Sequence, residues 1–154
     1  MKTLTFFLFL LIVQNSIGQA IVDTSTYAFP IGTHFILQLV EYKNELKYTV
    51  TKSDPYSKSL DYSNSESLFE KTPINGTIEC YFGKGIDQKG PFKSVLLVRN
   101  NSKSILEYKA LISYENRDGF YETSVVDLFP GVKSSELWND NLSGIVLTKF
   151  QKKK

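Results

Sequence analysis

The sequence predicts an all-β protein, an antiparallel β-sandwich preceded by an N-terminal β-hairpin. Three observations lead to this prediction. Apolar and polar residues alternate with a period of two along most of the chain, which is typical of half-buried strands. Turn signals rich in Asn, Asp, Gly and Pro separate these stretches at short intervals. Stretches with helical periodicity are almost absent, and they do not alternate with the predicted strands. This argues against a parallel α/β fold.

Residues 1–18 have the layout of a cleavable secretory signal peptide. Lys2 carries a positive charge, and an apolar run from Leu4 to Val13 follows it. This run has about half of the roughly 20 apolar residues that a membrane span needs. Small residues permit cleavage after Gly18 or Ala20. We therefore expect a secreted or periplasmic protein that is not an integral membrane protein.

Residues 19–72 are expected to hold the hairpin and a long connection. Phe35 and Leu37 share one face of a strand over 33–42, and Leu46, Tyr48 and Val50 alternate with polar residues in the next. An Asn-bearing turn at 43–45 joins the two strands. The connection over 53–72 is rich in Ser, Asp and Asn, with one helical turn expected around 67–71. The sequence leaves open whether 19–72 belongs to the same domain as the rest.

Residues 73–150 are expected to form the sandwich core. The first strand places Cys80 on an apolar face with Ile78 and Phe82. The run 95–98 is apolar on both faces, which indicates a central strand. The clearest strand, 105–114, directs Tyr108, Ala110 and Ile112 toward the core, as its alternation indicates.

The end of the chain is expected to add two further strands. A turn at 116–119 precedes a strand over 120–128, and the last strand spans 145–150. Ser134–Trp138 suits a single helical turn with a Ser cap. Residues 151–154 are expected to be a solvated basic tail.

A resemblance supports this outline for part of the chain. Val98-Arg99-Asn100 precedes a turn, an alternating strand from Leu106 to Ile112 follows, and Pro130-Gly131 forms a late turn. This order resembles the immunoglobulin-like sandwich modules of exported bacterial proteins, notably the FxLYD type. The name-giving motif is replaced here by Ile105-Leu106-Glu107-Tyr108. The resemblance implies an immunoglobulin-like β-sandwich, an extracytoplasmic location and no assigned catalytic residue.

Composition excludes several classes of function. The chain has 18 Lys and Arg against 16 Asp and Glu, so nothing favours a nucleic-acid partner. One Cys and one His exclude a disulfide framework and metal sites built from several of these residues. No phosphate-binding loop is present. We therefore expect no cofactor and no metal.

Other candidate sites have weaker support. Cys80 suits a buried core residue, although a nucleophilic pair with His34 is conceivable. The oxygen-rich segments 54–66 and 139–141 suit Asx turns better than calcium sites. Asn triplets at 75–77, 100–102 and 141–143 match the glycosylation signal, which depends on the source cell. Carboxylates that offer pairs for hydrolysis are Glu79, Glu107, Glu115, Glu122 and Asp127.

The predicted function is that of an exported, non-catalytic module that binds a protein or a glycan. Trp138 and Tyr56 lie outside the clearest strands and are the predicted ligand-binding residues, because large rings give contact area at low entropic cost. One alternative is a small secreted hydrolase that uses paired carboxylates. Another is a subunit or inhibitor that acts on a partner by strand pairing. The sequence does not predict the oligomeric state.

Overall fold

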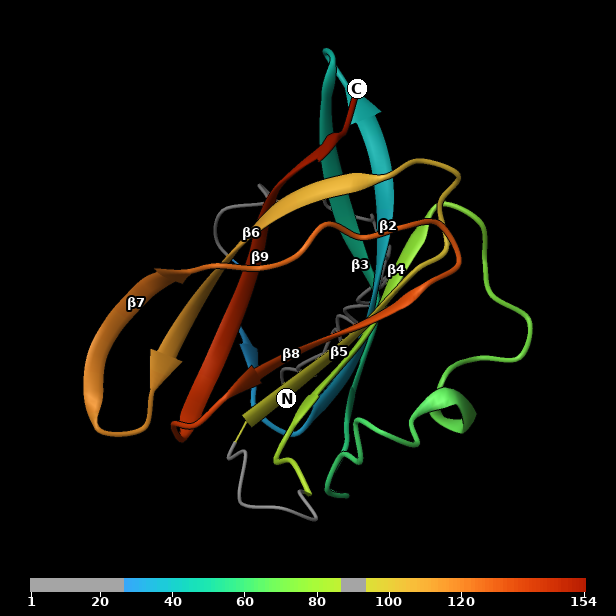
Figure 1. The fold of residues 1–154 in the computed structure, drawn as a ribbon. Helices are drawn as coiled ribbons and strands as arrows, with labels where there is room; N and C mark the ends of the chain where they lie inside the picture. The colour runs from blue at the N-terminus through green and yellow to red at the C-terminus, as the bar shows by residue number, and fades with distance from the viewer. Residues whose placement is uncertain (1–26, 87–93) are drawn as a thin grey trace, which may run out of the picture.

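The computed structural model describes residues 27–86 and 94–154. The predicted signal peptide lies outside these residues. The elements, in chain order, are β1 (Phe29–Pro30), β2 (Thr33–Tyr42), β3 (Glu45–Pro55), the 3-10 helix η1 (Glu66–Leu68), β4 (Thr77–Gly83), β5 (Ser94–Asn100), β6 (Leu106–Tyr114), β7 (Arg117–Thr123), β8 (Lys133–Trp138) and β9 (Leu142–Lys152) (Figure 1).

The strands form two antiparallel sheets, which confirms the predicted all-β sandwich. The five-stranded sheet has the order β3-β2-β4-β5-β8, and the four-stranded sheet has the order β1-β9-β6-β7. The N-terminal hairpin is not a separate unit, because β2 pairs with β4 on one side and with β3 on the other. Its turn has two residues, Lys43 and Asn44, both with positive φ (48° and 66°), as expected for a type I′ hairpin turn.

The core lies between the two sheets, and the apolar faces of the strands point into it. Tyr108, Ala110 and Ile112 of β6 are buried there, and so is Cys80 of β4, as the sequence predicts. The rings of Phe29 and other aromatic residues fill the space between the sheets. The aromatic core residues are Phe29, Phe35, Tyr48, Phe82, Tyr108 and Phe150.

The connection between β3 and β4 covers the outer face of the five-stranded sheet. Residues 56–76, here called the strap, carry Leu60 and Phe69 onto that face, where both are buried. They pack against Tyr81, Val95 and Leu97. As a result β5 is buried on both faces, which confirms the prediction of a central strand over 95–98.

The predicted helical turn at Ser134–Trp138 is wrong, because these residues belong to β8. They pair with β5 from Ser94↔Trp138 to Arg99↔Lys133. The short polar segment has a local preference for a capped turn, but β5 would otherwise expose unpaired backbone groups at its edge. Pairing between distant segments therefore outweighs the local preference.

Two boundaries near the C-terminus also differ from the prediction. The hairpin between β6 and β7 turns at residues 115–116, so that Tyr114 pairs with Arg117 and Gly119 lies within β7. Gln151 and Lys152 are not a solvated tail but the end of β9, where they pair with Glu107 and Leu106 of β6. This extension of β9 forms one wall of the site described next.

Candidate functional site

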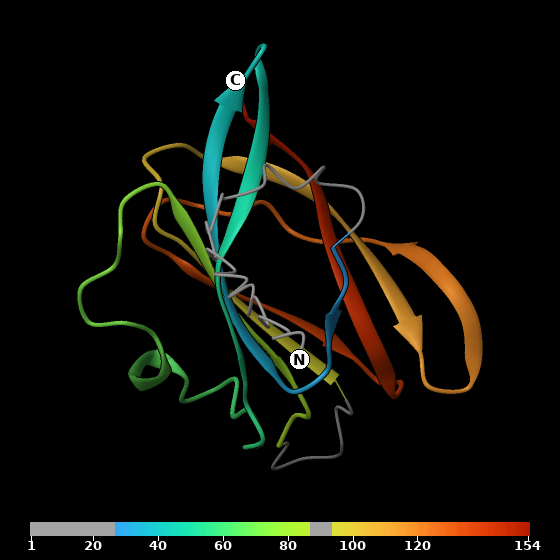
Figure 2. The same cartoon turned by 180° about the vertical axis from the view of Figure 1, so that it is seen from behind.

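Two strand edges lack a second partner and lie close together. β3 is the last strand of its sheet, so one of its edges is free. β9 pairs with β1 only at Gly144 and Ile145, and beyond this point no described strand pairs with that side of β9. Both views of the fold show the C-terminal end of β9 beside the tip of the β2–β3 hairpin (Figures 1 and 2).

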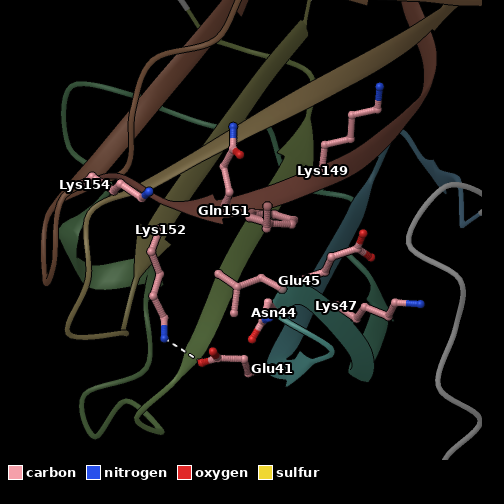
Figure 3. Close-up of a pocket in the computed structure, with 10 residues that line it drawn as sticks. Glu41, Asn44, Glu45, Lys47, Lys149, Gln151, Lys152 and Lys154 are labelled. Carbon is pink, nitrogen blue, oxygen red and sulfur yellow. Dashed lines mark hydrogen bonds and ion pairs between the residues drawn. The ribbon is translucent and has the colours of Figure 1, made fainter.

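A groove of about 550 Å³ separates the hairpin from β9 at this place (Figure 3). Its volume lies within the range of about 300–1,000 Å³ that is typical of ligand sites. Leu46 of β3 provides apolar surface and is partly exposed, whereas Phe150 of β9 belongs to the core and is only 3% exposed. We call this feature the β3–β9 groove. Its lining residues are Glu41, Asn44, Glu45, Leu46, Lys47, Lys149, Phe150, Gln151, Lys152 and Lys154.

The walls of the groove carry more positive than negative charge. Four lysines and two glutamates line it. Lys152 Nζ lies 2.7 Å from Glu41 Oε2, and this ion pair links β9 to the hairpin across the groove (Figure 3). Lys47 Nζ lies 5.2 Å from the ring centroid of Tyr42, a cation–π distance. Lys149 and Lys154 form no ion pair with any described residue.

Lys149 has a backbone conformation that is uncommon within a strand. Its φ is 53°, in the left-handed region, which costs a non-glycine residue of the order of 1 kcal/mol. The register between β9 and β6 shifts here, between Glu107 and Lys109. Such bulges redirect side chains and often occur beside functional sites. Here the bulge places Lys149 in the lining of the groove.

A buried ionic cluster lies elsewhere, between the five-stranded sheet and the strap. Glu79 of β4 is 1% exposed, and its two carboxylate oxygens accept hydrogen bonds from two different directions. Arg99 Nη2 lies 2.7 Å from Oε2, and the backbone NH of Glu70 lies 3.1 Å from Oε1. His34 Nε2 lies 3.3 Å from Oε1. We call these side chains, with the Glu70 backbone, the Glu79 cluster.

The Glu79 cluster binds the strap to the sheet. Burial by itself would raise the pKa of Glu79, but the hydrogen bonds from His34 and from the Glu70 amide, with the charge of Arg99, lower that pKa below its ordinary value. Arg99 also donates to the carbonyl oxygen of Glu70 at 2.8 Å. The hydroxyl of Tyr81 donates to the carbonyl oxygen of Leu68 at 2.7 Å. The carboxylate is therefore fully used by contacts within the fold.

The two predicted ligand-binding residues are both half-buried and lie apart. Tyr56 belongs to the strap and packs edge-on against Tyr81, with 5.1 Å between ring centroids. Trp138 packs against the core between the sheets and donates from Nε1 to Thr123 Oγ1 at 3.3 Å. They therefore contact opposite faces of the five-stranded sheet and do not form one aromatic surface.

The structure does not bring His34 and Cys80 together as a nucleophilic pair. Phe35 is the residue of β2 that faces Cys80, and His34 faces Tyr81 on the outer side of the sheet. The rings of His34 and Tyr81 stack, with 4.0 Å between their centroids. Burial, followed by the charge of Glu79, raises the pKa of the Cys80 thiol well above its ordinary value.

The candidate carboxylates outside the Glu79 cluster are mostly engaged in exposed ion pairs. Lys153 Nζ binds Asp127 and lies 3.5 Å from Glu107 Oε1, so these two carboxylates share one lysine. Glu122 binds Lys109 at 2.6 Å. No described group of three or more His, Cys, Asp or Glu side chains is arranged to hold a metal ion.

A second hollow lies between the β6–β7 and β8–β9 turns. It has about 460 Å³ and is lined by one aromatic ring and four polar or charged side chains. The backbone NH of Glu115 donates to the carbonyl oxygen of Asn141 at 3.0 Å and thereby joins the two turns. We call it the turn hollow. Its lining residues are Tyr114, Asn116, Arg117, Asp140 and Asn141.

Sequence reasoning did not find the β3–β9 groove, because it treated 151–154 as a solvated tail. The only local signal was Phe150, an apolar residue between the polar Lys149 and Gln151 at the predicted end of the strand. Within 27–86 and 94–154, no helix is both long and apolar enough to cross a membrane. Comparisons with family models, curated proteins and solved structures found no match.

Proposed function

We propose that the protein is an exported, non-catalytic module that binds a partner protein at the β3–β9 groove. One observation carries the proposal, the meeting of two unpaired strand edges beside a groove with an apolar floor. Backbone groups at such edges form hydrogen bonds with an added strand, which gives affinity, and nearby pockets give specificity. The mode of binding is therefore strand addition at the free edge of β9.

The side chains of the groove suit a surface that remains free until a partner arrives. Exposed strand edges invite pairing between identical chains, and lysines at such edges oppose it. Lys47 and Lys149 occupy this position on the two strands that border the groove. Leu46, which is partly exposed, supplies apolar contact for the other face of an added strand, and the nearly buried Phe150 supports it from the core.

Glycan binding is a second candidate, and the turn hollow favours it. The side chains of Asn116, Asp140 and Asn141 form no hydrogen bond with any described residue, so they are available to sugar hydroxyls. Tyr114 supplies an aromatic ring beside them. Binding of a neutral oligosaccharide that is lost in a Tyr114→Ala variant would favour this candidate over the first.

Site-specific photo-crosslinking in the producing cells tests the protein-binding proposal. A photoreactive phenylalanine analogue replaces Lys47 or Gln151 in the groove, and replaces Glu122 on the opposite edge strand β7 as the matched control. We expect a protein adduct from the two groove positions and none from Glu122. Adducts from Glu122 alone, or none at all, would contradict the proposal. Turnover of a substrate that is lost on Asp127→Asn or Glu107→Gln substitution would favour the hydrolase alternative instead.

A further inference from the structure

We infer that the partner segment is acidic at alternate positions and that one of its carboxylates replaces Glu41 at Lys152. This inference rests on the proposed function and narrows the chemistry of the partner. It concerns which strand the groove accepts, whereas the proposal above concerns only whether a partner protein is bound there.

The charge of the groove is the first argument. Four lysines face two glutamates across the lining. Among the four lysines only Lys152 forms an ion pair with a carboxylate of the described residues, while the charge of Lys149 acts on Glu122 of β7 from a greater distance. A segment with carboxylates satisfies the remaining charges, whereas a basic segment adds repulsion at short range. Complementary charge also speeds the encounter of the two proteins.

The geometry of an added strand is the second argument. Successive side chains of a strand point to opposite faces, so residues i and i+2 lie on the same face, about 6.6–6.8 Å apart. The groove combines the apolar surface of Leu46 with lysines on its walls. A strand that alternates acidic and apolar residues therefore directs one set to the lysines and the other to the apolar surface.

The Lys152–Glu41 ion pair is the third argument, because it crosses the groove that the segment enters. The two side chains are 52% and 60% exposed. An exposed ion pair between long side chains contributes little to stability. Lys152 can therefore exchange Glu41 for an incoming carboxylate at small cost. A segment without acidic residues cannot replace Glu41 at Lys152. The ion pair therefore adds to the selectivity of the groove for acidic segments.

Peptide binding to the purified full-length protein tests the inference. The probes are fluorescent, end-capped hexapeptides of alternating Glu and Val, alternating Lys and Val, and the acidic sequence with N-methylated backbone amides. We expect binding of the first peptide alone, with an affinity that falls as salt is added. Loss of binding on N-methylation shows that the backbone takes part as well as the charges.

Two pairs of variants resolve the roles of the side chains. Glu41→Gln should tighten binding of the acidic peptide several-fold, because Lys152 is released. Glu45→Gln is the matched control, with the same change of charge in the same groove but without the ion pair, and should tighten it less. Lys47→Gln and Lys149→Gln should each weaken binding by about 2–5-fold, the range expected for one exposed charge pair.

Several results would overturn the inference while the proposed function stands. One is a protein adduct from the photoreactive residue at Gln151 that persists in a variant with both Lys47→Gln and Lys149→Gln. Another is equal binding of the acidic and basic peptides, or an equal effect of Glu41→Gln and Glu45→Gln. Tighter binding of a sulfated polysaccharide than of the acidic peptide would assign the lysines to a polyanion other than a protein. Lysine variants that only self-associate would show that these lysines merely protect the edge.

Discussion

Glu79 and Arg99 form a nearly buried ion pair between β4 and β5, two adjacent interior strands of the larger sheet, with 2.7 Å between Oε2 and Nη2. The two residues occupy directly paired positions of β4 and β5. The backbone of Glu70 contacts both side chains, through its NH to the carboxylate and through its carbonyl oxygen to the guanidinium. The same pair therefore holds the sheet and the strap in one arrangement.

Removal of Arg99 should be strongly destabilising. In an Arg99→Ala variant the carboxylate of Glu79 stays buried without its main counter-charge, which typically costs about 3–5 kcal/mol in the free energy of unfolding. Urea denaturation followed by circular dichroism measures this change. Lys109→Ala is the matched control, since it breaks the exposed Lys109–Glu122 pair and should leave the midpoint almost unchanged. Equal midpoints for the two variants would refute the structural role of the Glu79 cluster.

Stability should depend on Glu79 in acid. The pKa of Glu79 is lower in the folded protein than its ordinary value of 4.5, so the unfolded state binds protons more readily. Its contribution to stability is therefore complete above about pH 4.5 and is lost as the pH falls through the lower folded value. Denaturation midpoints between pH 7 and pH 2, measured at high salt to screen exposed pairs, should fall less steeply in Glu79→Gln than in the unmodified protein. Parallel curves would contradict this prediction.

Cys80 should react slowly with thiol reagents. Its side chain is fully buried, and burial raises the pKa of the thiol, so that little thiolate is present or accessible. An aromatic disulfide reagent should therefore modify the native protein only as fast as it unfolds, and the denatured protein at once. Rapid modification of the native protein would show that Cys80 is not on the buried face of β4.

The mature protein should begin after Gly18 or Ala20. The apolar run from Leu4 to Val13 is short, and small residues surround both positions. Intact mass measurement of the protein recovered from medium or periplasm should show the loss of 1–18 or 1–20. Recovery from these fractions of a chain that still carries Met1 would contradict cleavage, and absence of the protein from both fractions would contradict the exported location.

The sequence predicts the faces of strands better than it predicts what covers them. Alternation correctly places Cys80 inward, and the doubly apolar run at 95–98 correctly indicates a strand buried on both sides. The polar sequence of Ser134–Trp138 carries no such signal, because its strand state depends on pairing with β5. The Glu79 cluster was not predictable from the sequence either. Glu79, Arg99 and His34 are far apart in the chain, and only the register of β2, β4 and β5 brings them together.

The candidate site was predictable only in part. Trp138 and Tyr56 were chosen because they lie outside the clearest strands, but each is packed against a different face of the same sheet. The β3–β9 groove depends on two edges from different sheets, and no local pattern reports how two sheets meet. The free edge of β3 follows from its place in the topology, which single-strand periodicity does not reveal.

The pairing of β1 with β9 has a consequence for how the chain reaches its native state. The first and last strands lie side by side, and Glu41 meets Lys152 across 111 positions of sequence. A contact between distant positions stabilises the chain only after a long loop has closed, and closing that loop costs conformational entropy. Topologies rich in such contacts therefore fold slowly. Until β9 has been synthesised, β6 can pair only with β7, so the smaller sheet is completed by the last strand that the structure describes.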